Sequence, residues 1–185
     1  MAKLKILVDL DDTVWDLCSA WINCLNKRFN RNVKLSDITE WDITKVYPGL
    51  SKNEIYSPLS EENLWKSIKI REDALEILPK LIDDGHEIFF VTATDYRNIK
   101  FKVDLIKKHF PYVPITNLII TYRKDMVKGD LLIDDGPHNF NGHFGFLMSA
   151  NHNLNEDVSK LGIVRVDHGI APFARCQTAW GWRSR

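Results

Sequence analysis

The sequence predicts an α/β fold: a doubly wound, Rossmann-like parallel sheet with helices on both faces and a small helical cap inserted after the first strand. Three observations predict it. An apolar strand opens the chain. From residue 73 onward, apolar runs alternate with helical stripes, which is the pattern of a parallel sheet. Residues 15–71 break this rhythm, so we expect an α/β core of residues 1–14 and 72–185 and a cap subdomain of residues 15–71.

The first strand and the first helix follow one another closely. The run KLKILVD at 3–9 is apolar between charged ends, as a buried strand is. After it, apolar side chains recur with the period of a helix. This stripe contains Val14, Leu17, Cys18, Trp21, Ile22, Leu25 and Phe29. The segment 30–56 is irregular, and VYPGLS marks a turn within it.

Two short helices are expected in the rest of the insertion. Ser51 and Glu54 have the spacing of a capping box, in which each side chain accepts a hydrogen bond from the backbone of the other residue. Pro58 interrupts this helix soon after it begins. Ser60 is expected to cap a further short helix that carries Trp65.

The remaining elements alternate regularly. A helical stripe at 74–82 is stopped by Gly85, and a second stripe at 99–110 is ended by Pro111. The expected strands are EIFFVTA at 87–93, NLIIT at 117–121, DLLIDD at 130–135, GFLMSA at 145–150 and GIVRV at 162–166. The closing segment TAWGWRSR is expected to be a tail pinned by aromatic packing.

Composition limits the classes of partner. The chain has 185 residues, 44% of them hydrophobic, and its 25 basic residues balance its 25 acidic ones. This balance, without an apolar run of membrane-spanning length, argues against a nucleic acid polymer or a membrane as partner. Cys18, Cys24 and Cys176 lack a disulfide-framework spacing and indicate reduced thiols of a cytoplasmic protein. The six histidines show no spacing typical of a zinc site. The sequence is compatible with a homodimer.

Two clusters of carboxylates follow apolar strands. Asp9, Asp11 and Asp12 end the first strand, and Asp134 and Asp135 end DLLIDD. Carboxylates repel one another and cost free energy to desolvate, so this gathering needs a cause. The carboxyl ends of parallel strands meet at one edge of a sheet, where such folds bind ligands. A cation would satisfy both clusters, and Mg²⁺ is the ion that prefers oxygen ligands and phosphate.

Thr92 and Lys124 complete this constellation. Thr92 ends the strand EIFFVTA, and Lys124 lies just past NLIIT, with Lys128 as the alternative lysine. Acidic residues at one strand end are usually caps or solvated turns, but two clusters with these residues in order favour a functional site. Such groups suit phosphoryl transfer. Mg²⁺ and Lys124 offset the charge of a phosphate, Thr92 and the backbone N–H groups after it bind phosphate oxygens, and a carboxylate can act as the nucleophile.

These residues resemble a known superfamily. DLDDTV is similar to the first motif, D-x-D-x-[TV]-[VLI], of the haloacid dehalogenase-like (HAD) phosphatases. Thr92, Lys124 and the pair Asp134–Asp135 match the second, third and fourth motifs in order. TYRKDMVKGDLLIDDGPHNF resembles the corresponding stretch of the 5'(3')-deoxyribonucleotidases, and DITEWDI resembles part of their cap. The resemblance covers about residues 5–145.

The resemblance implies Mg²⁺-dependent hydrolysis of a small-molecule substrate, a deoxyribonucleoside monophosphate. Asp9 would be the nucleophile that becomes phosphorylated. Asp11 would protonate the leaving oxygen and later activate water. Asp9, the backbone carbonyl of Asp11, and Asp134 would hold Mg²⁺. Residues 15–71 would form the cap that closes over the substrate.

The remaining roles concern the phosphate and the substrate. The resemblance implies that Thr92, the Ala93 amide and Lys124 hold the phosphate, and that Asp135 supports the metal site from the second shell or through water. Two positions depart from the family pattern: Ala93 replaces a frequent hydroxyl residue, and Gly136 replaces a frequent basic residue. Both positions lie near the substrate in that family, so the nucleotide preference stays open.

Other interpretations of the same residues were considered. Trp15, Trp41 and Trp65 are candidates for stacking on a base, although packing is the default role of each tryptophan; Trp41 is the candidate that we favour. The alternatives for the whole chain are a phosphatase of another small phosphomonoester such as a sugar phosphate, a phospho-accepting receiver module, and a silent binding protein. A receiver needs neither Asp11 beside Asp9 nor a cap-sized insertion.

Overall fold

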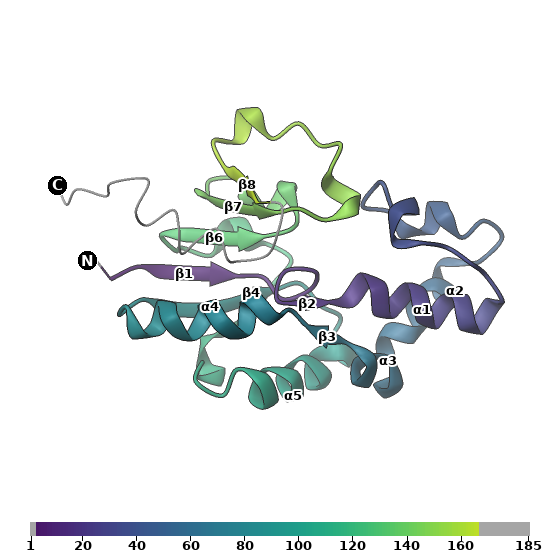
Figure 1. Ribbon diagram of the computed structural model, residues 1–185, viewed down its shortest axis with the longest axis horizontal. Coiled ribbons are helices and arrows are strands. Elements are labelled where there is room, and N and C mark those ends of the chain that lie inside the picture. Colours follow the sequence, from purple (N-terminus) through teal and green to yellow (C-terminus); the bar gives the residue numbers. More distant parts are fainter. Residues whose placement is uncertain (1–2, 167–185) are drawn as a thin grey trace.

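Six parallel strands form the centre of the computed structural model, which describes residues 3–166 (Figure 1). Their spatial order is β5-β4-β1-β6-β7-β8. The strands are β1 (Lys5–Val8), β4 (Glu87–Thr92), β5 (Leu118–Ile120), β6 (Leu131–Asp134), β7 (Gly145–Met148) and β8 (Val164–Val166). Each lies inside the run that predicts it, which confirms the parallel α/β fold.

Helices account for most of the other regular structure. The α-helices are α1 (Leu17–Phe29), α2 (Lys52–Tyr56), α3 (Glu62–Ser67), α4 (Glu72–Asp83) and α5 (Ile99–His109). The 3-10 helices are η1 (Leu35–Asp37), η2 (Ile43–Val46), η3 (Ser57–Ser60), η4 (Tyr96–Asn98), η5 (Ile115–Asn117), η6 (Lys124–Met126), η7 (Pro137–Phe140), η8 (Asn151–Asn153) and η9 (Ser159–Leu161).

The register of the strands places the two acidic tips side by side. Val8 pairs with Phe90 of β4 on one side and with Ile133 of β6 on the other. The backbone N–H of Asp9 then donates to the carbonyl of Ile133 at 2.9 Å. Asp9 and Asp134 therefore lie on neighbouring strands at the carboxyl edge of the sheet, which is the edge that binds ligands in open parallel sheets.

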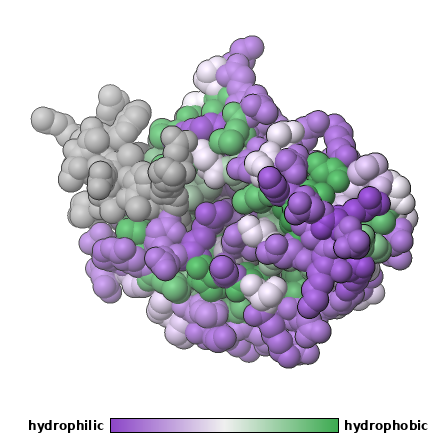
Figure 2. Space-filling view, turned by 45° about the vertical axis from the view of Figure 1, so that its right-hand side comes forward, coloured by the Kyte–Doolittle hydropathy of each residue, from purple (hydrophilic) through white to green (hydrophobic). Residues whose placement is uncertain are grey.

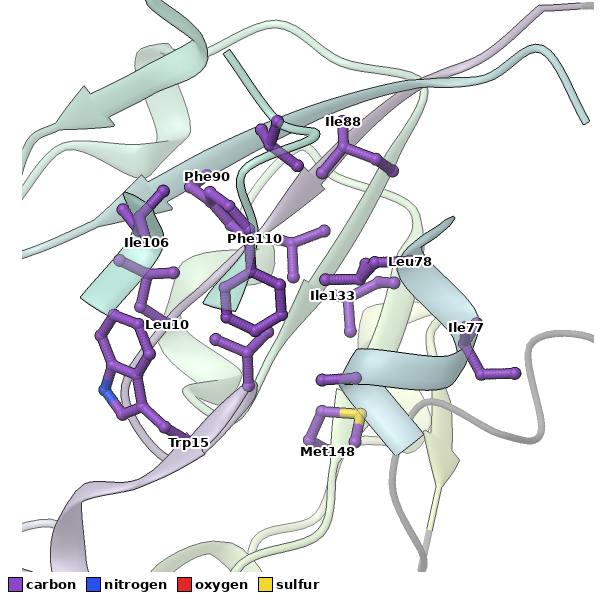
Figure 3. Close-up of a cluster of buried hydrophobic side chains, with 14 of the residues drawn as sticks. Leu10, Trp15, Ile77, Leu78, Ile88, Phe90, Ile106, Phe110, Ile133 and Met148 are labelled. Atoms are coloured by element: carbon purple, nitrogen blue, oxygen red, sulfur yellow. The ribbon is translucent and has the colours of Figure 1, made fainter. Parts of the chain in front are cut away.

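Helices α4 and α5 cover one face of the sheet. Alternate residues of each strand point to this face, among them Phe90 and Ile133. Leu78 of α4 and Ile106 of α5 pack in the same buried cluster (Figure 3). Helix α4 ends as predicted, with Gly85 at a φ of 91° that residues with a side chain rarely adopt. Burial of these apolar stripes is what fixes the two helices to the sheet.

The other face of the sheet carries a smaller core. Leu7, Val91 and Leu132 lie in it, and Phe140 of η7 packs against them. Both α4 and α5 belong to the first face, so within residues 3–166 this second face is covered by 3-10 helices and connecting segments. Helices therefore lie on both faces as expected, but only those on the first face are α-helices.

The insertion after β1 forms a helical unit with a core of its own. Strands β2 (Trp15–Asp16) and β3 (Lys69–Ile70) pair antiparallel and form its stem. Helices α1 to α3 lie beyond this stem, to the right of the sheet in Figure 1. Its buried cluster consists of Cys18, Ile22, Leu25, Ile38, Ile43, Tyr47 and Ile55. That the unit closes over a substrate stays a prediction.

The two capping expectations for the insertion have different outcomes. The capping box at the start of α2 is confirmed: Ser51 N–H donates to Glu54 Oε2 at 2.8 Å, and Glu54 N–H donates to Ser51 Oγ at 3.3 Å. The cap expected at Ser60 is wrong, because α3 begins after Glu61 and has no side-chain cap. Ser60 instead donates from Oγ to Asn98 Oδ1 at 3.4 Å, which joins the insertion to the core.

The surface in view is mostly hydrophilic, with hydrophobic residues in separate patches (Figure 2). Within residues 3–166, no helix combines the length and the apolar character that crossing a membrane requires. Cys18 and Cys24 are free thiols. Cys176 and the segment TAWGWRSR lie outside the described residues.

Candidate active site

Lys124 bridges the two acidic strand tips. Its Nζ lies 2.6 Å from Asp9 Oδ1 and 2.6 Å from Asp134 Oδ2. All three side chains are almost completely buried. Lys124 opens η6, just past β5, so three separate segments meet here as the sequence predicts. Lys124, rather than Lys128, is the lysine that reaches the carboxylates.

Asp134 is fixed by three donors. Besides Lys124, the Gly136 N–H and Asn139 Nδ2 each donate to Asp134 Oδ1 at 2.8 Å. Sequence reasoning missed Asn139, which η7 carries back toward the strand end. The structure also explains the glycine at 136: a Cβ there would lie 2.6 Å from Asn139 Nδ2 and 3.2 Å from Asp134 Oδ1. A side chain at 136 would therefore force the Asn139 side chain to shift.

We expect Gly136→Ala to loosen the acidic site. The added methyl must push Asn139 away from Asp134, so one donor that orients this carboxylate is lost. Loss of a hydrogen bond to a metal ligand typically lowers metal affinity by about tenfold or more. We expect a comparable rise in the Kd for Mg²⁺, measured by calorimetry. Gly142→Asn is the matched control, because nothing lies within 4 Å of a Cβ there and asparagine tolerates its φ of 82°. An unchanged Kd in Gly136→Ala would contradict this view of the loop.

Asp11 is oriented by Trp15 and Lys102. Trp15 Nε1 donates to Asp11 Oδ1 at 2.8 Å, and Lys102 Nζ lies 2.6 Å from Asp11 Oδ2. Trp15 has no exposed surface, so its predicted role as a stacking platform is wrong: it is a core residue that holds a carboxylate. Because both Asp11 oxygens have donors, this carboxylate is held rigidly beside Asp9.

Lys102 is the principal residue that sequence reasoning missed. Its side chain is buried, and besides Asp11 its Nζ donates to Thr92 Oγ1 at 2.7 Å and to the Ala93 carbonyl at 3.3 Å. A signal was present in the sequence. Lys102 falls three residues after Ile99 and four before Ile106, so it lies on the inward stripe of its helix, where an ammonium group needs partners.

The structure groups the predicted site residues into two adjoining networks. One contains Asp9, Lys124 and Asp134. The other contains Asp11, Thr92 and Ala93, joined by Lys102. Asp9 and Asp11 are two residues apart, and therefore both networks meet at the end of β1.

The acidic site has the donor set of a hard divalent cation. Asp9, Asp134 and Asp135 each offer a carboxylate oxygen, and these atoms lie within 4.8 Å of one another in a buried position. An all-oxygen donor set fits Mg²⁺. The Lys124 ammonium between two of these carboxylates shows that they need positive charge. The Asp11 side chain is committed to Trp15 and Lys102, so its contribution to a metal would come from its backbone carbonyl, as the resemblance implies.

Burial controls the ionisation of these groups. It raises the pKa of Asp9 well above its usual range, against the opposing effect of Lys124. Burial and then the charge of Asp134 raise the pKa of Asp135 to about 8. Although burial acts to lower it, the pKa of Lys124 is raised by the carboxylates of Asp9 and Asp134. Ionising every carboxylate here is therefore unfavourable unless further positive charge is present.

We expect the stability of the metal-free protein to fall as pH rises. Folded Asp9 and Asp135 have pKa values above those of the unfolded chain, so between about pH 4 and 8 the folded state binds more protons and loses stability with increasing pH. A divalent ion removes this penalty, since it binds the ionised carboxylates. In EDTA we expect Tm to fall by about 5 °C or more from pH 5.5 to 8.5, and Mg²⁺ to raise Tm more at pH 8.5 than at pH 5.5. Equal effects of Mg²⁺ on Tm at both pH values would contradict the view that the ion binds the ionised carboxylates.

A cavity of about 390 Å³ opens beside Asp11 and Lys102. Its other walls include Leu17, Tyr56, Ser60, Trp65, Asn98 and Tyr122. They come from the insertion on one side and from the core on the other, so a molecule bound here would contact both. The volume is in the range of pockets that bind small ligands.

Trp41 does not line this cavity. Its ring makes edge contacts with His138 at 4.6 Å and with His152 at 4.9 Å between ring centroids. These contacts join the insertion to the loops after β6 and β7. The role in base stacking that we favoured for Trp41 is therefore not supported. Trp65, another of the tryptophans considered, does reach the cavity wall and stacks on Phe101.

Comparison with known proteins identifies the family. The family described as "5' nucleotidase, deoxy (Pyrimidine), cytosolic type C protein" matches residues 3–167. The chain belongs to this family. It is a phosphoric monoester hydrolase with the HAD-like fold, and the resemblance predicted from its four motifs is confirmed.

Individual relatives agree with this assignment. The chain is 31% identical over 158 residues to a 5'(3')-deoxyribonucleotidase from Bacillus subtilis, covering 84% of this chain and 90% of that one. It is 32% identical over 162 residues to a 5'(3')-deoxyribonucleotidase from Clostridium acetobutylicum, covering 85% and 88%. A HAD-like family hydrolase from Streptococcus pneumoniae has the same fold, with a TM-score of 0.64, 10% identity, and 96% and 98% of the two chains covered.

Proposed function

We propose that this chain is a Mg²⁺-dependent 5'(3')-deoxyribonucleotidase that hydrolyses nucleoside monophosphates through an aspartyl-phosphate on Asp9. One observation carries the proposal: the tips of β1 and β6 bring Asp9 and Asp134 onto the same buried cation, the Lys124 ammonium. The names of the relatives in Bacillus subtilis and Clostridium acetobutylicum support the substrate class.

The first half of the reaction forms a bond to Asp9. A carboxylate oxygen of Asp9 attacks phosphorus while the bond from phosphorus to the nucleoside oxygen breaks, and Asp11 gives its proton to that leaving oxygen. Lys124, Thr92 Oγ1 and the Ala93 N–H hold the phosphate oxygens in this step. A phosphoryl group placed here would replace part of the contact between Lys124 and the two carboxylates.

The second half releases phosphate. Asp11, now ionised, removes a proton from water, and the resulting hydroxide attacks phosphorus as the bond to Asp9 breaks. Asp9, Asp134 and the Asp11 backbone carbonyl would hold Mg²⁺, with Asp135 in support. When bound, Mg²⁺ neutralises charge between the phosphate and the attacking carboxylate.

The cavity supports a nucleoside as the leaving group. It begins at Asp11, the proposed acid, and its walls combine aromatic rings with polar side chains such as Ser60 and Asn98. In this proposal residues 15–71 are a cap that shields the reaction from water, and residues 1–14 and 72–185 are the catalytic core. Free Cys18 and Cys24 support a cytoplasmic location.

A phosphate-release screen tests the function. The panel contains 5' and 3' ribo- and deoxyribonucleoside monophosphates and small sugar phosphates, each with Mg²⁺ and with EDTA. We expect the highest kcat/KM for deoxyribonucleotides, with release abolished by EDTA. A preference for sugar phosphates would favour the alternative phosphatase. A stable phosphoprotein with no turnover would favour the receiver.

A further inference from the structure

A second group of potential metal ligands lies beside the acidic site. Asp12, Asp135 and His152 each offer one ligand atom, and the three atoms lie within 4.8 Å of one another. Asp12 follows β1, Asp135 follows β6, and His152 lies in η8 after β7. Because β1, β6 and β7 are neighbours in the sheet, their carboxyl ends bring these residues together. None of the roles proposed above uses Asp12 or His152.

The imidazole of His152 is the unusual member of this group. Only 8% of its surface is exposed, and its Nε2 is buried with no hydrogen-bond partner. The nearest carboxylate oxygen, Asp135 Oδ2, lies 2.9 Å away without the alignment of a hydrogen bond. A buried imidazole nitrogen without a well-aligned hydrogen bond costs free energy, and an ion bound by His152 and Asp135 together would remove that cost.

The spacing of these atoms suits two ligands of one ion. Ligand atoms that lie about 2.1 Å from a tetrahedral Zn²⁺ ion are about 3.4 Å from each other. His152 Nε2 and Asp135 Oδ2 are 2.9 Å apart, so a small outward movement of either side chain would let both bind one ion. Asp12 is already oriented, because its Oδ1 accepts a hydrogen bond from the Cys18 N–H at 2.9 Å. Trp41 packs against the His152 ring from the insertion side and limits its freedom to turn away.

We propose that Asp12, Asp135 and His152 form a second metal site that takes a borderline transition ion, such as Zn²⁺, in preference to Mg²⁺. One imidazole nitrogen with two carboxylates is a donor set typical of Zn²⁺ and similar ions, whereas Mg²⁺ prefers oxygen ligands alone. Sequence analysis does not predict this site, because its ligands lie far apart in the chain and the histidine is grouped with aspartates instead of with another histidine or a cysteine.

Zinc binding in the presence of excess Mg²⁺ tests the site directly. Millimolar Mg²⁺ occupies all-oxygen sites, and Zn²⁺ is then titrated against a chromogenic chelator, without any substrate. We expect one Zn²⁺ per chain that Mg²⁺ does not displace, and a Kd that rises about tenfold or more in His152→Gln. His138→Gln is the matched control, because His138 also contacts Trp41 but is not in the ligand group. Equal losses in both variants, or none in His152→Gln, would overturn the site.

A second measurement uses the unaltered protein, so its result does not depend on whether a variant folds. Histidine side-chain ¹⁵N spectra are recorded before and after one equivalent of Zn²⁺ in excess Mg²⁺. We expect the Nε2 resonance of His152 to shift and those of the other histidines to stay in place. A shift elsewhere, or none at His152, would refute the proposal. Neither experiment involves turnover, so its failure would leave the proposed phosphatase reaction intact.

Discussion

Asp9→Asn is expected to abolish turnover, with kcat lower by a factor on the order of 10⁴ or more. The amide has nearly the same shape as the carboxylate, but it is a poor nucleophile and cannot form the proposed acyl phosphate. Substitution also removes one of the two negative charges that face Lys124 in the buried network. Initial rates of phosphate release at saturating Mg²⁺ measure the effect.

Asp104→Asn is the control for this variant. Asp104 lies on the exposed side of α5 and pairs with Lys100 at 3.2 Å. It has no role in the proposed reaction. We expect it to turn over like the unaltered protein. Asp9→Asn with a rate close to normal and a normal melting temperature would rule out covalent catalysis by Asp9.

Lys102→Met is expected to lower kcat for nucleotides by a factor of about 10² to 10³, the range typical of lost acid–base catalysis. Methionine keeps an unbranched apolar side chain at this buried position but removes the ammonium that holds Asp11 and Thr92. Breaking a buried ion pair typically costs about 3–5 kcal/mol, and the cost here should lie at the low end because Asp11 retains 26% side-chain exposure.

Two substrates with different leaving groups distinguish a loss of Asp11 positioning from general damage to the fold. A p-nitrophenolate leaves without needing a proton, so we expect Lys102→Met to lose much less activity on p-nitrophenyl phosphate than on a nucleotide. Lys100→Met, two residues earlier on the same helix, is the matched control, because Lys100 is exposed and its contacts are a surface ion pair with Asp104 and the ring of Phe101, not the acidic site. Equal losses on both substrates would assign Lys102 a structural role only.

The sequence is sufficient for the strands and for the two acidic tips. Apolar runs of strand length bounded by charges located β1 and β6, and the geometry of parallel sheets then required Asp9 and Asp134 to share an edge. Lys124 could be chosen over Lys128 by its spacing to Asp134 and by the family motif. These inferences succeed because they depend on short-range pattern and on one general property of the fold.

Contacts between distant segments are what the sequence does not reveal. Trp15 was a candidate for stacking because it falls in the predicted cap, but the stem strand β2 turns its ring into the core toward Asp11. Trp41 was favoured from its motif, whereas the path of the irregular segment around it carries the ring to His138 and His152. Such placements are decided by tertiary packing, and local periodicity does not predict them.

The most direct test of the account is to trap the phosphorylated enzyme. In Asp11→Asn the proposed base is missing, while p-nitrophenyl phosphate needs no acid to react, so the covalent intermediate should form and persist. After acid quenching, intact mass and peptide fragmentation report the amount and position of bound phosphate. The account predicts nearly one phosphoryl group per chain, on Asp9, and only when Mg²⁺ is present. Phosphate released without a labelled chain, or a label on any other residue, would contradict it.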